Sequence, residues 1–107
     1  MDAEELKRRY AAGEREFTGA NLSGVRLIGA NLVGINLWGA NLSGANLAKA
    51  NLTRANLSGV KLTEANLRQA RLVNAKLFGA NLSGAYYDET TRFTRGFDPA
   101  SNSMRQV

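Results

Sequence analysis

Residues 40–59 read ANLSGANLAKANLTRANLSG, four consecutive copies of one five-residue pattern. Alanine comes first in each copy, asparagine second and leucine third, so that Leu42, Leu47, Leu52 and Leu57 lie five residues apart. A period of five matches neither the 3.6 residues per turn of a helix nor the two-residue alternation of a strand. The pattern therefore predicts a repeat architecture in which every unit turns a corner.

The same spacing extends from this stretch in both directions. Five residues rotate a helix by about 500°, so a helix would place successive leucines on every side and form no apolar stripe. A continuous strand is excluded as well, because an odd spacing would point alternate leucines to opposite faces. The leucines that we expect to face inward are Leu22, Leu27, Leu32, Leu37, Leu42, Leu47, Leu52, Leu57, Leu62, Leu67, Leu72, Leu77 and Leu82.

A short extended piece followed by a turn satisfies the pattern. In the unit that begins at Ala40, alternation points Ala40 and Leu42 inward and Asn41 and Ser43 outward. Gly44 then lies at the bend, where a positive φ costs glycine nothing. Because every bend turns the same way, the chain winds into stacked coils that pair at about 4.8 Å. We therefore predict an all-β solenoid with leucine and alanine inside.

Asparagine precedes the leucine in nine of the units. Stacked coils would arrange these amides in columns, where each side chain bonds either to its neighbour or to the backbone of the turn. Both arrangements are structural, and neither requires a ligand. The positions are Asn21, Asn31, Asn36, Asn41, Asn46, Asn51, Asn56, Asn66 and Asn81.

Composition limits the chemistry of the chain. At 107 residues we expect one domain over 1–107. The sequence contains no cysteine and no histidine, which excludes disulfides, thiolate and imidazole catalysis, and the usual zinc and haem sites. It has no apolar run of about eighteen residues, so we expect no membrane span. The acidic start, Met1 to Glu5, is unlike a secretion signal, and a cytoplasmic location is expected.

The repeated motif Ala-Asn-Leu-x-x resembles that of the pentapeptide-repeat family, over about fifteen units within residues 15–87. The flanking segments are similar to those of small members common in photosynthetic bacteria. The resemblance implies a right-handed, quadrilateral β-helix with four pentapeptides per coil and roughly four coils. From the residues that the chain lacks, independently of this resemblance, we expect no catalysis, no cofactor and no metal site.

Residues 1–14 are expected to form a capping helix over one end of the solenoid. Asp2 is suited to the N-cap, Leu6 and Tyr10 share one helix face, and Gly13 fits just past the helix end. Such a helix would hide the apolar core and the unpaired edge of the first coil.

Residues 88–107 are expected to form a C-terminal cap, because the five-residue spacing stops after Tyr87. Asp98 and Pro99 suit the start of a helix, with the aspartate as its cap. With both ends covered, we expect no end-to-end polymerisation, and a monomer with weak dimerisation as the alternative. The apolar residues of this segment are Phe93, Phe97, Met104 and Val107.

Two groups of outward side chains are candidate interaction surfaces. With twenty residues per coil, Trp38, Ser58 and Phe78 form one column, in which the aromatics are either ordinary surface residues or a binding or dimer contact. The body, residues 17–87, carries seven bases against one acid, a balance of 7 − 1 = +6. The candidate basic surface, either a solvated edge or an anion-binding site, consists of Lys49, Arg54, Arg68 and Arg71.

No catalytic constellation is present, because the only acid of the body is Glu64 and a filled tube has no cleft. The leading hypothesis is a rigid scaffold whose partner is another protein. The alternative is binding of nucleic acid or another polyanion through the basic surface. Some members of the family mimic DNA and act on type II topoisomerases through rows of aspartate. The basic body of this chain has the wrong sign for that role.

Overall fold

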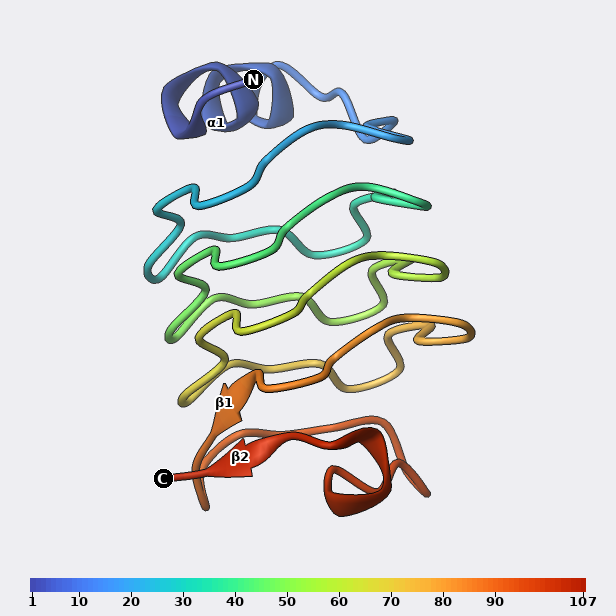
Figure 1. The fold of residues 1–107 in the computed structure, drawn as a ribbon. Coiled ribbons are helices and arrows are strands. Elements are labelled where there is room, and N and C mark those ends of the chain that lie inside the picture. The colour runs from blue at the N-terminus through green and yellow to red at the C-terminus, as the bar shows by residue number, and fades with distance from the viewer.

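A computed structural model describes residues 1–107, and its body is a stack of coils between two caps (Figure 1). Parallel bridges join residues twenty apart, such as Asn21 with Asn41 and Asn41 with Lys61. Twenty residues hold four pentapeptides, so each coil has four units. Each unit contributes a single bridge position to each neighbouring coil, so the body consists of isolated bridges and has no long strands. The regular elements are α1 (Ala3–Ala11), β1 (Tyr86–Tyr87), the 3₁₀ helix η1 (Ala100–Asn102) and β2 (Arg105–Gln106).

The corner of each unit is a tight turn closed by a backbone hydrogen bond. In the unit that begins at Ala40, the N–H of Ala45 donates to the carbonyl of Leu42 at 3.0 Å, and Gly44 has a φ of 67°. A positive φ at this position is the signature of a type II turn. Five corners adopt the same conformation without glycine, with φ between 59° and 63°, at Lys49, Arg54, Glu64, Gln69 and Asn74.

The asparagine column is hydrogen-bonded to the turn backbone. In all nine units the asparagine Oδ1 accepts from the backbone N–H two residues later, as between Asn41 and Ser43 at 3.0 Å. No asparagine side chain of the column bonds to another one. Of the two predicted arrangements, the structure therefore adopts the local one, in which each asparagine closes its own turn.

The interior of the tube is filled by leucine and by small apolar residues. Twelve of the thirteen leucines are 2% exposed or less, and the alanines between them are largely buried. Ile35 and Val60, which replace alanine, are fully buried as well. Leu77 is the exception, because it is only partly buried. It belongs to the last coil, beneath which the irregular C-terminal segment packs without a further bridge at Lys76.

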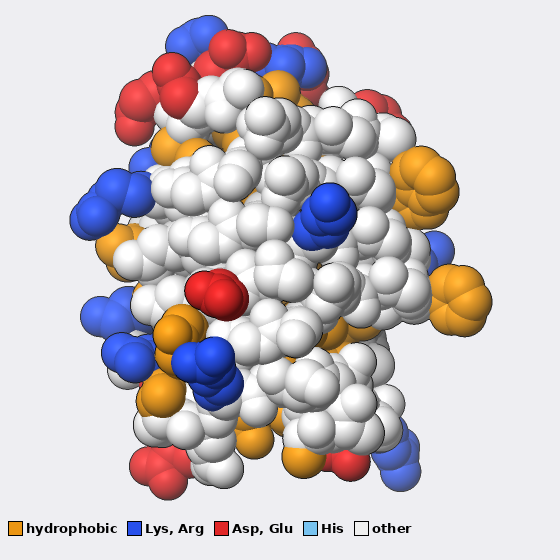
Figure 2. All heavy atoms as spheres, viewed as in Figure 1, with side chains coloured by type: hydrophobic (Ala, Val, Ile, Leu, Met, Phe, Trp, Pro, Cys, Tyr) orange, Lys and Arg blue, Asp and Glu red, His pale blue; other side chains and the backbone are white.

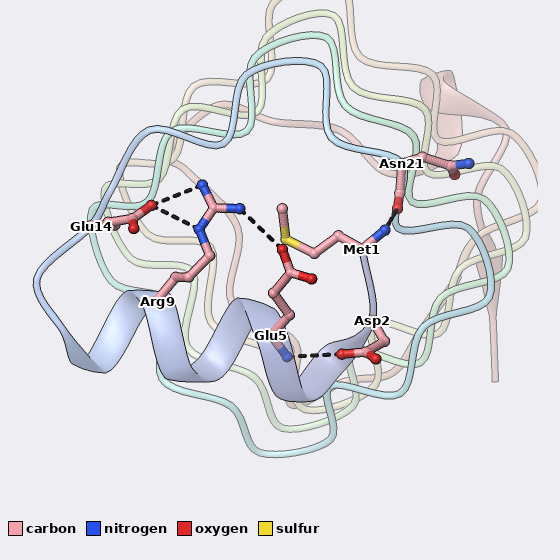
Figure 3. A network of polar contacts seen from close by, with 6 residues as sticks. All are labelled: Met1, Asp2, Glu5, Arg9, Glu14 and Asn21. Carbon is pink, nitrogen blue, oxygen red and sulfur yellow. Dashed lines mark hydrogen bonds and ion pairs between the residues drawn. The ribbon is translucent and has the colours of Figure 1, made fainter.

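The N-terminal cap lies across the open end of the first coil (Figure 3). α1 begins with Asp2, whose Oδ1 accepts from the N–H of Glu5 at 2.8 Å. Leu6 is fully buried against the core, and the hydroxyl of Tyr10 donates to the carbonyl of Val33 at 2.8 Å. The helix predicted over residues 1–14 is thus present as Ala3–Ala11, and it covers both the apolar core and part of the unpaired edge.

Arg9 ties the end of this helix to the start of the coil. Its guanidinium donates to Glu14 at 2.8 Å and forms an ion pair with Glu5 at 3.4 Å (Figure 3). It also lies 4.9 Å from the ring centroid of Phe17. The hydrogen bond to Glu14, followed by the charges of Glu14 and Glu5, raises the pKa of Arg9. All three salt bridges of the chain lie between residues 4 and 14.

The C-terminal cap closes the other end only in part. β1 and β2 pair in parallel, and Phe93 stacks on Phe97 with ring centroids 4.8 Å apart beneath the core. The helix predicted to start at Asp98 is the single 3₁₀ turn η1, whose Ala100 N–H donates to Asp98 Oδ1. No bridge continues beneath Lys76, and Leu77 and Ala80 stay partly buried, so the cap that was expected here covers this side of the last coil by side-chain packing alone. α1, at nine residues, is the longest helix, and none could cross a bilayer.

Candidate functional site

The two exposed aromatics of the body occupy one column of the coil. Parallel bridges place Asn36, Asn56 and Lys76 in register, so Trp38 and Phe78, each two residues later, lie two coils apart. At the spacing of paired strands this is about 10 Å. Trp38 is 55% exposed and Phe78 is 89% exposed. The partly buried Ser58 between them leaves the two rings accessible from the same side.

The backbone at both aromatics is hydrogen-bonded to the preceding coil. The carbonyl of Trp38 accepts from the N–H of Gly19 at 2.8 Å, and the carbonyl of Phe78 accepts from the N–H of Gly59 at 2.9 Å. Figure 2 shows two large hydrophobic side chains that project from the right-hand edge of the body, with smaller hydrophobic groups elsewhere on this face. Single exposed apolar residues are ordinary, but two large aromatics on the same side of the body form a candidate contact surface.

The four residues of the basic surface lie on two neighbouring units of successive coils. The N–H of Lys49 donates to the carbonyl of Arg68, so these residues are neighbours in adjacent coils. Arg71 pairs with Asn51 in the coil above. The backbone N–H of Arg54 donates to the carbonyl of Val73, which belongs to the same pentapeptide as Arg71. All four side chains are exposed, and none forms an ion pair.

The C-terminal segment adds residues that the sequence did not assign to this surface. Arg92 bridges Arg71 in parallel, and β1 carries Tyr86, whose ring lies 5.8 Å from the guanidiniums of both Arg68 and Arg105. Arg92 follows Arg71 by 21 residues, whereas the repeat would place the bridge at residue 91. This one-residue slip explains why the five-residue period alone does not find Arg92.

A shallow groove lies where this segment meets the last full coil. Its volume is about 580 Å³, and it is lined by Gln69, Arg71, Val73, Thr90 and Arg92. A second groove of about 630 Å³ separates α1 from the first coil. Its lining residues are Asp2, Ala3, Glu4, Lys7, Val25, Arg26 and Ile28.

Asp88 fixes one wall of the groove that contains Arg71. Its Oδ1 accepts from the Thr90 hydroxyl at 2.7 Å, from the Thr90 N–H at 3.0 Å and from the Gln69 N–H at 3.2 Å. These hydrogen bonds, with the one from the Thr90 side chain foremost, lower the pKa of Asp88. The carboxylate is therefore occupied by its own loop and by the neighbouring coil.

Neither groove contains a cluster of side chains that could hold a metal ion. No group of three or more Asp, Glu, His or Cys side chains is placed to hold a metal ion. No buried polar side-chain atom lacks a hydrogen-bond partner. The geometry on this molecule is that of rigid outer faces with aromatic and cationic side chains.

Comparison with known proteins relates the chain to one family. A family model described as pentapeptide repeats matches in eight copies over residues 20–59 and 55–86. The pentapeptide repeat protein alr5209 from Nostoc Pcc 7120 is 34% identical over 99% of this chain and 96% of its own, with a TM-score of 0.70. A search of curated proteins gave no match.

Two further cyanobacterial structures are similar over smaller shares of their length. Rfr23 from Cyanothece 51142 is 33% identical over 73% of this chain and 63% of its own, with a TM-score of 0.40. HetL from Nostoc sp. strain PCC 7120, described as involved in heterocyst differentiation regulation, is 32% identical over 88% of this chain and 57% of its own, with a TM-score of 0.39. The family implies a right-handed β-helix. From the repeat model and the full-length match, the chain belongs to the pentapeptide-repeat family.

Proposed function

We propose that this protein is a rigid, non-catalytic module that docks another protein. The observation that carries the proposal is the column of Trp38 and Phe78, two large aromatics exposed on the same side of the coil. Aromatic residues dominate the energetics of protein interfaces, because they bury a large area and lose little rotamer freedom. A coil whose backbone is hydrogen-bonded above and below also pays little ordering cost on binding.

The experiment is differential capture with an aromatic double variant, Trp38→Ser with Phe78→Ser. Immobilised wild type and variant are exposed to an extract of the source organism, and a protein lost with the variant is purified and titrated directly. We expect the purified partner to bind the variant at least tenfold more weakly. The matched control is Ile28→Ser with Val73→Ser, two other exposed apolar residues at 45% and 37% exposure. Equal loss in the control, or none in the aromatic variant, would contradict the proposal.

A second candidate is binding of a polyanion through the basic surface of Lys49, Arg54, Arg68 and Arg71. It is favoured by the absence of any ion pair among these four cations, all of which are exposed. Unpaired cations release counterions from a phosphate backbone, so the affinity for DNA should fall steeply with salt. A salt titration of DNA binding tests this candidate, and the lack of binding at low salt would remove it.

DNA mimicry is not part of the proposal. The body carries seven bases against one acid, and Figure 2 shows acidic side chains gathered mainly at the ends of the molecule. A protein that replaces DNA on its target needs negative charge along its length. We therefore expect no inhibition of gyrase in a supercoiling assay.

A further inference from the structure

One of the parallel bridges between coils, called a rung below, pairs two residues of like charge. Arg71 and Arg92 face each other in a parallel bridge, with the N–H of Leu72 donating to the Arg92 carbonyl at 2.6 Å and the N–H of Arg92 donating to the Ala70 carbonyl at 2.9 Å. Every other bridge of the body has at least one uncharged member, which is asparagine in each case. Like charges directly opposite one another destabilise a ladder. This rung therefore carries a cost that the rest of the coil avoids.

No protein carboxylate forms an ion pair with either arginine. The guanidinium of Arg71 has no hydrogen bond to the protein and no salt bridge. Arg92 donates from Nη1 to the backbone carbonyls of Glu89 at 3.0 Å and Thr91 at 3.5 Å, and it forms no ion pair. Each guanidinium has five N–H donors, so most of the donors on this rung are free. The nearby Asp88 directs its Oδ1 to its own loop and to Gln69 instead.

The two arginines line the groove of about 580 Å³ together with Gln69, Val73 and Thr90. One wall is held in place by Asp88, and the other belongs to the hydrogen-bonded coil. Two guanidiniums at one rung can each present a pair of parallel N–H donors to a tetrahedral oxyanion. The groove has only these two cations in its lining, so it suits one doubly charged group better than a long chain of singly charged ones.

We propose that this groove binds a single phosphate group, as inorganic phosphate or as a phosphomonoester dianion. This proposal rests on the second candidate function, binding of a polyanion through the basic surface. It is more specific, because it assigns the anion to the pair of Arg71 and Arg92. Bound phosphate would remove the repulsion between Arg71 and Arg92 and so stabilise the last coil. The proposal is independent of the aromatic column.

The test is a titration of the ¹⁵N-labelled protein with sodium phosphate at constant ionic strength, followed through the amide signals of Gln69, Val73 and Thr90. We expect saturable shifts in the wild type and an affinity at least tenfold weaker in Arg71→Asn. This variant should fold, because asparagine stands at nine equivalent positions and would accept from the Val73 N–H. Arg54→Asn is the charge control, since it removes one arginine at a corner outside the groove and should bind phosphate as the wild type does.

Thermal unfolding supplies a second readout. Without phosphate we expect Arg71→Asn to melt at a higher temperature than the wild type, because the like-charge pair is gone and the asparagine would close its turn. Phosphate should raise the melting temperature of the wild type and of Arg54→Asn but not that of Arg71→Asn. Linear, unsaturable shifts, or an equal loss of binding in both variants, would overturn the proposal.

Additional ligands distinguish the sources of the phosphate. Tighter binding of a phosphoserine peptide than of inorganic phosphate, with no binding of the unphosphorylated peptide, would place the group on a protein. Equal binding of the two phosphates would identify the free anion, and both results support the site. A single-stranded oligonucleotide that binds Arg71→Asn and the wild type equally well, while phosphate binds neither, would overturn the site. That result would leave the polyanion candidate standing.

Discussion

Leu52 lies in the middle of the stack, is fully buried, and belongs to the apolar cluster that fills the tube. Its unit alternates a large inward residue with a small one, Ala50, which is also fully buried. This alternation fills a narrow tube at the density of a normal protein interior. At the scale of the residue, the stability of the fold therefore depends on the volume of each leucine.

We predict that Leu52→Ala lowers the free energy of unfolding by about 2–5 kcal/mol, because the tube cannot collapse around the void. Urea denaturation followed by circular dichroism measures this change. The matched control is Leu77→Ala, at the partly open end of the coil, where water can enter the space left behind. We expect a smaller loss there, and equal losses at the two positions would show that the interior is not closed at Leu52.

The asparagine that precedes an inward leucine stabilises the turn of its own unit. Asn41 accepts from the N–H of Ser43 at 3.0 Å, whereas Lys61, its neighbour in the same column, has no such acceptor for Thr63. We predict that Asn41→Ala lowers the free energy of unfolding by about 1 kcal/mol, the usual net value of one hydrogen bond. Lys61→Ala should be nearly neutral. If thermal melts show the same change for both, the asparagine bonds do not stabilise the turns.

Asp88 holds the loop after β1 against the last full coil, through its bonds with Thr90 and Gln69. Its pKa in the folded protein lies below the ordinary value of 3.8, so the carboxylate binds protons less readily in the folded than in the unfolded state. The stabilisation is therefore complete above that ordinary value and is lost as the pH falls through the lower, folded one. We predict that Asp88→Asn is less stable than the wild type at neutral pH.

The measurement for Asp88 is a series of thermal melts between neutral and strongly acidic pH. The difference between wild type and Asp88→Asn should shrink as the pH drops below about 4, where the unfolded-state carboxyl becomes protonated. Glu89→Gln is the control, because its carboxylate is exposed and forms no hydrogen bond. A difference that stays constant down to the lowest pH would mean that the charge of Asp88 does not matter.

Across the whole molecule, each coil contacts only its neighbours, so the stack should tolerate the loss of a complete coil. Deletion of residues 41–60 removes twenty residues and preserves both the leucine spacing and the bridge register. We predict that this variant keeps the β-helix spectrum with reduced stability, because repeat stability is a sum of unit and neighbour terms. Deletion of residues 41–58 breaks the spacing by two residues and should abolish cooperative unfolding.

Several features of the protein follow from its sequence alone. The leucine period places the core, the glycine positions predict the corners, and Asp2 and Gly13 bound the capping helix to within two residues. These inferences succeed because the same local constraint recurs in every unit, so many residues give independent evidence for the same turn-and-strand geometry. Lys49 and Gln69 even adopt the glycine conformation at their corners, since the coil imposes it on each unit.

Tertiary structure decided what the period does not describe. Beyond Tyr87 no repeat exists, so neither the slip that sets Arg92 beside Arg71 nor the partial exposure of Leu77 can be read from spacing. The sequence also left open whether each asparagine side chain bonds to the next asparagine or to its own turn, and only the folded stack shows that it bonds to its own turn. A repeated motif determines the geometry of each unit, because every copy has the same local constraints. The contacts at the C-terminal end depend on how one irregular segment packs, and that segment occurs only once in the sequence.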